Sequence, residues 1–354
     1  MIEVGIAGCG YWGSKHLRVF NELPDARVAA ACDTDTERLD QISVSYPLTF
    51  TTQDYDEMLA GDIQAVVIAT PAKTHFAMAK KALLRNKHVL VEKPFTTTTA
   101  QALELIQLAE EKGRTVMVGH TFLYSPPIRA LRKLIQSGHL GRLLYIHSAR
   151  LNFGLLQPDV NVLWDLAPHD ISIVLHLMGQ TPVAVGARGI GYLNRRLSEV
   201  AHADLLFSDS VLAHIHVSWL EPSKVRRFTV IGTERMAVFD DLANGEPLKI
   251  YDREVKLSAQ NGGKPQTPTY LYGDIRIPHV GNAEPLREEC SDFLHCIRTG
   301  KAPLSDGWTG LQVVGVLESL QRSLGNHGTM MTVGFNSAED DGVRPFTASS
   351  TPRG

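Results

Sequence analysis

The chain has 354 residues, 44% of them hydrophobic, which suffices for two domains that each bury a core. Its 35 Lys and Arg residues nearly balance its 38 Asp and Glu residues, and no block of five like charges occurs, so a nucleic-acid partner is not expected. Four scattered cysteines indicate a reducing compartment, and neither a signal peptide nor the ~18 consecutive apolar residues of a membrane span are found, so we expect a cytoplasmic protein without a membrane partner.

The first 120 residues alternate short apolar runs with helical patterns, which is typical of a parallel sheet built from βαβ units. The apolar runs are rich in Val, Ile and Ala with little alternation, as expected of strands covered on both faces. The predicted strands are Glu3–Ala7, Val28–Cys32, Ala65–Ala69, His88–Val91 and Thr115–Val118, and the predicted helices are Tyr11–Asn21, Asp35–Val44, His75–Arg85 and Thr98–Lys112. We therefore expect an α/β domain over residues 1–120.

From about Thr121 the apolar segments become longer and more alternating. The predicted helices are Ile128–Ser137, Trp164–Met178, Leu286–Arg298 and Gly307–Leu324, and the predicted strands are Leu143–Leu151, Val183–Gly189, Ala201–Leu206, Val211–Trp219, Phe228–Ile231 and Met236–Asp240. A short polar turn joins the third and fourth of these strands, which predicts an antiparallel hairpin. Residues 121–335 are thus predicted to form an α+β domain with a mostly antiparallel sheet, and the polar residues 336–354 a flexible tail.

The sequence Gly8-Cys9-Gly10-Tyr11-Trp12-Gly13 follows the first predicted strand and opens the first helix. In this context the glycines permit a tight turn, the close approach of a pyrophosphate, and close packing of the helix on the strand. Asp33 ends the second strand, where a carboxylate accepts from the ribose hydroxyls of an adenosine and repels a 2′-phosphate. The pattern predicts a Rossmann domain that binds NAD rather than NADP. The alternative is a structural glycine turn with a solvated aspartate.

Two further segments flank this expected nucleotide site. Tyr11 and Trp12 lie at its mouth, with packing at the helix start as the alternative. The loop after the third strand also belongs here, because ligands of open parallel sheets lie beyond the carboxyl ends of the strands. Its candidate cofactor contacts are Thr70, Pro71, Thr74 and His75, with helix capping as the alternative for the last two.

The sequence Glu92-Lys93-Pro94 follows the fourth predicted strand. A lysine at the carboxyl end of a central strand, fixed by a proline, points toward the crevice where a nicotinamide would lie. Loops also hold such triplets by chance, so the prediction depends on position rather than on composition.

Asp165 and His169 are four residues apart and share one face of a helix. A carboxylate that hydrogen-bonds one imidazole nitrogen fixes the tautomer and raises the basicity of the other, as a general base for an alcohol proton requires. Pro168 suits the first turn of a helix and not its middle, so Asp165 is expected just before the regular turns begin. The alternative is a capping aspartate with an interfacial histidine.

We do not expect a metal site. His214 and His216 alternate on one strand face, and such a pair without a third ligand is typical of a polar sheet face. Cys290 and Cys296 do not share a helix face.

Several of these motifs together resemble the Gfo/Idh/MocA oxidoreductase family. They are the glycine loop 8–13, Ala69-Thr70-Pro71, Glu92-Lys93-Pro94, the Asp165 and His169 pair, and Gly300–Asp306. The resemblance runs from Met1 to about Phe335 and implies that Lys93, Asp165 and His169 match the catalytic triplet of the family. We also place Glu92 and His120 among the candidate cofactor contacts. The resemblance further implies a large open sheet in the second domain, through which homodimers or homotetramers form.

Within the family, the runs Gly119–Pro126 and Asn161–Asp170 are most similar to enzymes that oxidise C3 of a UDP-N-acetylhexosamine or its uronic acid. Similar runs occur in relatives that act on free sugars, inositols or aminoglycoside sugars. The expected sugar or phosphate contacts, each with packing as the alternative, are Tyr124, Arg150, Asn152 and Asn161, beside Lys93 and His169. Arg150 suits a diphosphate because its planar fork binds phosphate oxygens bidentately.

The predicted reaction is reversible hydride transfer between a sugar secondary alcohol and the nicotinamide. His169, oriented by Asp165, takes the hydroxyl proton, and the cationic Lys93 holds the same oxygen and stabilises its growing negative charge. In the alternative assignment Lys93 is the base. The other hypotheses are a 3-ketosugar-nucleotide reductase, glycosidase chemistry through transient oxidation at C3, and a non-catalytic NAD-binding regulator, which loss of Lys93 or of the Asp165 and His169 pair would favour.

Overall fold

The chain divides into two compact units. The computed structural model describes residues 1–154, 156–157, 160–257 and 268–334. Within these ranges, the first unit contains Met1–Tyr124 and Ala283–Glu318, and the second contains Ser125–Asn282 and Ser319–Gly334. The predicted tail, 336–354, lies outside the described residues. Within those same ranges, none of the helices has both the length and the apolar character needed to cross a bilayer.

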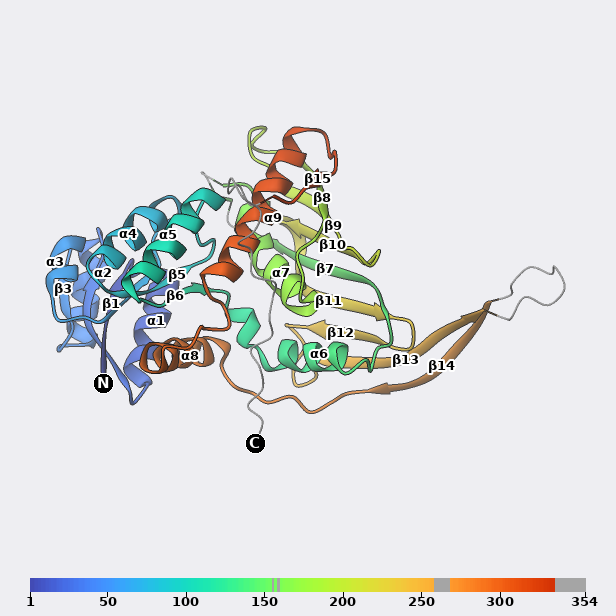
Figure 1. Ribbon diagram of the computed structural model, residues 1–354, viewed down its shortest axis with the longest axis horizontal. Coiled ribbons are helices and arrows are strands. Elements are labelled where there is room, and N and C mark those ends of the chain that lie inside the picture. The colour runs from blue at the N-terminus through green and yellow to red at the C-terminus, as the bar shows by residue number, and fades with distance from the viewer. Residues whose placement is uncertain (155, 158–159, 258–267, 335–354) are drawn as a thin grey trace. The chain divides into compact units, whose positions relative to one another are not determined.

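The first unit is built on a parallel sheet whose strands, among the described residues, have the order β3-β2-β1-β4-β5-β6 (Figure 1). They are β1 (Ile2–Ala7), β2 (Ala26–Cys32), β3 (Phe50–Thr52), β4 (Ala65–Ile68), β5 (His88–Glu92) and β6 (Val116–Gly119). All residues of β4 are buried, and because successive side chains point to opposite faces, both faces of the sheet are covered there. The strand order changes direction between β1 and β4, which places the loops after these strands where dinucleotides bind.

Helices connect these strands. They are α1 (Tyr11–Glu22), α2 (Thr36–Ser45), α3 (Tyr55–Ala60), α4 (Ala72–Leu84) and α5 (Thr99–Lys112). Asp35 caps α2 and Thr98 caps α5, each by accepting from backbone N–H groups of the first turn. The Rossmann fold predicted from the sequence is confirmed. The sequence missed β3 and α3, because elements this short contain too few positions to show a period.

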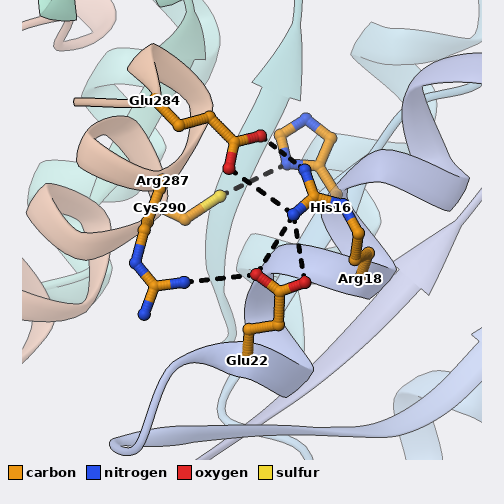
Figure 2. A network of polar contacts seen from close by, with 6 residues as sticks. All are labelled: His16, Arg18, Glu22, Glu284, Arg287 and Cys290. Carbon is orange, nitrogen blue, oxygen red and sulfur yellow. Dashed lines mark hydrogen bonds and ion pairs between the residues drawn. The ribbon is translucent and has the colours of Figure 1, made fainter. Parts of the chain in front are cut away.

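A late helix completes the first unit, although the sequence placed it in the second domain. Helix α8 (Pro285–Thr299) packs on α1, with the ring centroids of Phe20 and Phe293 6.5 Å apart. Arg18 pairs with Glu284 across the same contact (Figure 2). These two charged residues are 266 positions apart in the chain, and a contact at that separation leaves no local signal in the sequence.

The second unit is built on a mostly antiparallel sheet, with the order β14-β13-β12-β11-β7-β10-β9-β8-β15 over the described part of the chain (Figure 1). Its strands are β7 (Leu143–Phe153), β8 (Ala184–Ile190), β9 (Val200–Leu206), β10 (Leu212–Ser218), β11 (Leu220–Gly232), β12 (Met236–Asp240), β13 (Leu248–Leu257), β14 (Pro268–Arg276) and β15 (Met331–Thr332). Strands β7 and β10 are parallel neighbours. The predicted hairpin is confirmed, since Leu206 pairs with Leu212 across its turn.

Helices α6 (Pro126–Gln136) and α7 (Val162–Met178) pack against this sheet, and α9 (Gly307–Gly325) enters the unit at Ser319. The short 3-10 helix η1 (Thr121–Tyr124) precedes α6 and belongs to the first unit. Strands β13 and β14 were not predicted. They form a hairpin that extends beyond the neighbouring strands (Figure 1), and every residue of β14 is exposed. A strand without a buried face lacks the alternation on which a prediction depends.

Candidate active site

The glycine loop after β1 fits the pyrophosphate of a dinucleotide. Gly8 has a φ of +84°, and a Cβ there would lie 2.7 Å from the carbonyl oxygen of Ala69. A Cβ on Gly13 would lie 1.8 Å from the carbonyl oxygen of Gly8, so α1 can pack this closely only without a side chain at Gly13. At Gly10 a Cβ would meet no described atom nearer than Arg38 Nη1, at 3.8 Å. Gly10 therefore leaves room for a phosphate to approach the start of α1.

Tyr11 and Trp12 stand at the start of α1. Tyr11 is exposed and Trp12 is half-buried, and their rings meet edge to face with centroids 5.5 Å apart. Neither side chain is buried in the core, so both remain candidates for contact with a bound nucleotide.

Asp33 at the end of β2 is buried, and backbone groups fix its carboxylate. Its Oδ2 accepts from the N–H of Cys9 at 2.6 Å, and its Oδ1 accepts from the N–H of Asp35 at 2.9 Å. Arg38 on α2 places Nη1 3.6 Å from Asp33 Oδ2. The carboxylate suits ribose hydroxyls, whereas Arg38 is a cation of the kind that accommodates a 2′-phosphate. Sequence reasoning missed Arg38, whose only signal was a basic residue early in the helix after the second strand.

The loop after β4 is bound to itself and to the loop after β5. Thr70 Oγ1 lies 2.7 Å from Thr74 Oγ1, which donates to the carbonyl of Pro71 at 2.7 Å. His75 is buried, with Nδ1 2.8 Å from the carbonyl oxygen of Pro94 and Nε2 2.8 Å from that of Thr70. Both ring nitrogens therefore face protein carbonyls. The cofactor contact expected of His75 is replaced by a contact between two loops, because α4 directs this side chain inward.

Lys93 follows β5 directly and is half-buried. The N–H of Lys93 donates to Oε2 of Glu92 at 3.2 Å, and Oε1 of Glu92 lies 2.8 Å from Nε2 of His16 on α1. Burial raises the pKa of Glu92, but the hydrogen bond with His16 and the charges of His16 and Lys93 outweigh burial and lower this pKa overall. Glu92 is therefore an ionised group that holds the Lys93 backbone. Sequence reasoning missed His16, which occupies a buried helix position like many others.

His120 follows β6 and is buried, and neither of its ring nitrogens has a hydrogen-bond partner among the described residues. Burial lowers the pKa of His120 to about 4, so the ring is neutral at pH 7. Buried polar atoms rarely lack a partner. This imidazole therefore fits the cofactor contact expected of it.

Tyr124 is fully buried in the first unit. Its Oη donates to Asp292 Oδ2 at 2.7 Å and lies 3.3 Å from Ser305 Oγ. These contacts favour the packing alternative over the substrate contact expected of Tyr124.

Asn161 begins α7 in the second unit. Its Oδ1 accepts from the N–H of Trp164 at 3.1 Å, and its Nδ2 donates to Gln321 Oε1 at 2.8 Å. Asn161 is thus a buried helix cap that also joins α7 to α9. These contacts favour the packing alternative over the substrate contact expected of Asn161.

Asp165 and His169 lie one turn apart on α7, both half-buried. Oδ2 of Asp165 accepts from Nε1 of Trp219 at 3.0 Å. The expectation that Asp165 precedes the regular turns is wrong: α7 begins at Val162 and contains Pro168. Burial of α7 along most of its length stabilises the helix enough to tolerate the missing N–H of the proline. Trp219 was also missed, because it lies on a distant segment between β10 and β11.

Arg150 on β7 is buried and forms an ion pair within the second unit. Its Nε donates to Asp170 Oδ2 at 2.6 Å, and Asp170 Oδ1 accepts from Ser148 Oγ at 2.6 Å. Asp170 directly follows His169 in the sequence, so its bond with Arg150 supports the segment that carries this histidine. Asn152, two residues along β7, has a buried Oδ1 with no partner among the described residues, which suits a polar ligand.

Four histidines gather on the outward face of the second sheet, and three pairs of their rings stack: His147 with His214, His202 with His214, and His202 with His216. The centroids of His202 and His216 are 4.1 Å apart, and those of His147 and His214 are 5.7 Å apart. Nδ1 of His214 lies 2.7 Å from Asp204 Oδ1. Over the described ranges, no three His, Cys, Asp or Glu side chains are placed to hold a metal ion.

Comparisons with known proteins agree with these two units. Residues 2–120 match a family model described as oxidoreductase family, NAD-binding Rossmann fold, and residues 128–238 match the Gfo/Idh/MocA C-terminal domain. UDP-N-acetylglucosamine 3-dehydrogenase of Acidithiobacillus ferrooxidans is 30% identical over 319 residues, covering 88% of this chain and 94% of that one. A crystal form of that enzyme superposes with a TM-score of 0.77 at 27% identity, covering 91% and 97% of the two chains.

A more distant relative acts on a different alcohol. Inositol 2-dehydrogenase 2 of Saccharopolyspora erythraea is 30% identical over 191 residues, covering 52% of this chain and 56% of that one. These relatives are dehydrogenases, and the two matched domains account for both units of the structure. The chain therefore belongs to the Gfo/Idh/MocA family of oxidoreductases, with an NAD-binding Rossmann domain followed by the C-terminal domain of that family.

Proposed function

We propose that this oxidoreductase removes a hydride from a sugar secondary alcohol, at C3 of a UDP-N-acetylhexosamine or a close relative. The observation that carries the proposal is the placement of Lys93, which is held by Glu92 at the carboxyl end of β5 in the same unit as the glycine loop. Similarity to a UDP-N-acetylglucosamine 3-dehydrogenase over nearly its whole length supports this substrate class.

The residues divide the work of the reaction between them. Bound NAD supplies the hydride acceptor, its C4 nicotinamide carbon. Lys93 holds the hydroxyl oxygen and stabilises the negative charge that grows on it. His169 takes the hydroxyl proton, and Asp165 orients its ring from one turn earlier on α7. The same groups serve the reverse reduction of a 3-ketosugar nucleotide, so the direction follows the ratio of oxidised to reduced cofactor.

The residues of the glycine loop and the strand ends fit NAD. Gly10 leaves room for the pyrophosphate, Asp33 accepts from ribose hydroxyls, and the unpartnered imidazole of His120 offers a polar contact. Asp33 supports NAD over NADP, because a carboxylate there repels a 2′-phosphate. Arg38, a cation that could bind this phosphate, is instead paired with Asp33.

In the second unit, Asn152 is the best-supported sugar contact because its buried Oδ1 has no partner in the described ranges. The Nε of Arg150 is held by Asp170, which favours a structural role for Arg150 over the expected diphosphate contact. Inositols, free sugars and aminoglycoside sugars are the competing substrates, and similarity to an inositol 2-dehydrogenase favours the first of these.

We further propose that the outward face of the second sheet joins copies of the chain. Tyr145 and Leu212 are exposed on this face beside the stacked histidines. Light scattering after size exclusion checks the proposal: the wild type is expected as a dimer or tetramer and Tyr145→Glu as smaller species. A monomeric wild type would contradict it.

Incubation with NAD and a panel of substrates tests the proposed function. The panel contains UDP-sugars, free sugars, inositols and aminoglycosides, and the readout is the absorbance band of NADH. We expect reduction with UDP-N-acetylhexosamines in the wild type and in Lys73→Ala, an exposed lysine on α4, but not in Lys93→Ala. Reduction with inositols alone would overturn the substrate class, and no reduction with any compound would overturn the function.

A further inference from the structure

Two buried imidazoles contact the three-residue segment that carries Lys93. His16 reaches Oε1 of Glu92 with Nε2 at 2.8 Å, and Oε2 of Glu92 accepts from the N–H of Lys93. His75 places Nδ1 2.8 Å from the carbonyl oxygen of Pro94. The side chains of His16 and His75 are at most 1% exposed. Each residue of the segment 92–94 therefore has a polar contact: the Glu92 carboxylate with His16, the Lys93 N–H with Glu92, and the Pro94 carbonyl with His75.

Both ring nitrogens of His16 contact neighbouring side chains. Nδ1 lies 3.6 Å from Sγ of Cys290 on α8, a contact drawn in Figure 2. Burial, and next the charge of Glu289, raise the pKa of Cys290 well above its ordinary value, so the thiol keeps its proton. Glu92 is ionised and only accepts, so Nε2 carries a proton and donates to it. Helix α8 thereby contacts the ring that holds Glu92 and, through Glu92, the backbone of Lys93.

His75 connects two loops through separable contacts. Nε2 faces the carbonyl of Thr70, in the loop after β4, and Nδ1 faces the carbonyl of Pro94, next to Lys93. A carbonyl oxygen only accepts, so each contact forms when the facing nitrogen carries a proton. Burial lowers the pKa of His75, so the ring is neutral at neutral pH and carries one proton. The tautomer with this proton on Nδ1 donates to the carbonyl of Pro94, and the tautomer with it on Nε2 donates to that of Thr70.

We propose that His16 and His75 are positioning residues that fix the segment 92–94 and thereby place the Lys93 ammonium for the reaction. The inference rests on the function proposed above, in which Lys93 holds the reacting oxygen. A displacement of about 1 Å costs as much as ~10²-fold in rate. Loosening this segment is thus expected to lower kcat while the glycine loop still binds the cofactor.

Asparagine and glutamine at position 75 separate the two contacts of the ring. His75→Asn keeps a donor near Nδ1, facing Pro94, whereas His75→Gln keeps one near Nε2, facing Thr70. We expect His75→Gln to lower kcat about 10- to 100-fold with little change in KM for NAD. His75→Asn is expected to raise KM for NAD with a much smaller loss of kcat. Equal changes of kcat and KM in the two variants would indicate only a structural role and would overturn the proposal.

Hydrogen exchange at the Lys93 amide tests the His16 contact without any substrate. His16→Leu removes the donor to Glu92, and His16→Gln keeps one near Nε2. We expect exchange about tenfold faster in His16→Leu, because a carboxylate released from His16 no longer protects the Lys93 N–H, and near the wild-type rate in His16→Gln. Exchange equal to wild type in His16→Leu would overturn the proposal. If His16→Leu does not fold, His16→Phe, which keeps a ring but no donor to Glu92, supplies the same comparison.

A third histidine controls for general loss of stability. His88 lies at the amino end of β5, where its Nδ1 accepts from the N–H of Thr115 at 3.0 Å. His88→Gln is expected to lower Tm without changing kcat or the exchange of the Lys93 amide. If the wild type oxidises no sugar, the proposed function fails, and the exchange measurements still decide whether His16 positions Lys93.

Discussion

The candidate residues of the two units are held in different ways. In the first unit they follow the carboxyl ends of parallel strands, where backbone geometry places Gly8 and Asp33 and the adjacent Glu92 holds the N–H of Lys93. In the second unit Asp165 and Arg150 bond side chains on other elements, Trp219 and Asp170, which lie 54 and 20 residues away in the sequence. The candidate nucleotide site is therefore encoded by local motifs, and the environment of α7 by tertiary contacts. Variants that remove one kind of contact at a time test this difference.

Removing the proposed reacting group from either unit should have the same consequence. Lys93→Ala and His169→Ala are each expected to lower kcat ~10²- to 10⁴-fold, the usual contribution of a positioned acid, base or charge. Titration calorimetry should show NAD affinity within about threefold of wild type, because the glycine loop is untouched. Turnover like that of the wild type in both variants would remove the proposed roles.

The buried ion pair of the second unit should dominate stability rather than turnover. Arg150→Met leaves the Asp170 carboxylate buried without its partner, at a cost of about 3–5 kcal/mol in the free energy of unfolding. The double variant Arg150→Met, Asp170→Leu should recover much of this loss in urea titrations. If Arg150→Met instead keeps its stability and loses affinity for UDP, Arg150 is a diphosphate contact and not a structural one.

Acid should destabilise the first unit through the buried neutral side chain of His120. Burial lowers the pKa of His120 to about 4 in the folded chain. Between about pH 6.5 and pH 4, His120 is therefore protonated in the unfolded chain but neutral in the folded one. Stability is therefore lost as the pH falls from about 6.5 to about 4, by up to about 3 kcal/mol for this group. His120→Asn should flatten the dependence of the unfolding free energy on pH, and His295→Gln, an exposed histidine on α8, should not. Equal slopes in the three proteins would contradict this.

Cofactor choice should depend on one carboxylate and its neighbouring cation. Asp33→Ser is expected to lower kcat/KM for NAD about 10- to 100-fold, the effect of losing a charged hydrogen bond, and to raise activity with NADP. The released Arg38 explains the gain, so adding Arg38→Ala should abolish it. A gain that survives without Arg38 would show that another group binds the 2′-phosphate.

The smallest effect tests the contact between Trp219 and Asp165. Trp219→Phe removes the donor to Asp165 Oδ2 and should lower kcat about 5- to 10-fold with KM unchanged. Trp164→Phe is the matched control, because it removes an indole N–H on α7 that donates to Gln321. It should leave kcat unchanged. Equal effects of the two variants would indicate a general loss of packing.

The success of prediction from the sequence follows the same division between local and distant contacts. The parallel sheet, the glycine loop and the Glu92-Lys93-Pro94 segment were predictable because each is a local pattern in a single stretch of chain. The roles of His75 and Tyr124 were not predictable from the sequence. A side chain buried in contact with protein groups and one that contacts a ligand look alike there. Helix α8 was assigned to the other unit because its partner α1 lies at the far end of the chain.

Isotope transfer from C3 of the sugar to the cofactor tests the proposed hydride transfer itself. UDP-N-acetylglucosamine carrying deuterium at C3 is incubated with the enzyme and NAD, and the reduced cofactor is examined by mass spectrometry. We expect one deuterium in each reduced cofactor, formed far more slowly by Lys93→Ala. Reduced cofactor without deuterium would show that hydride leaves another carbon, and no reduction of NAD by this or any other sugar would contradict the proposed function.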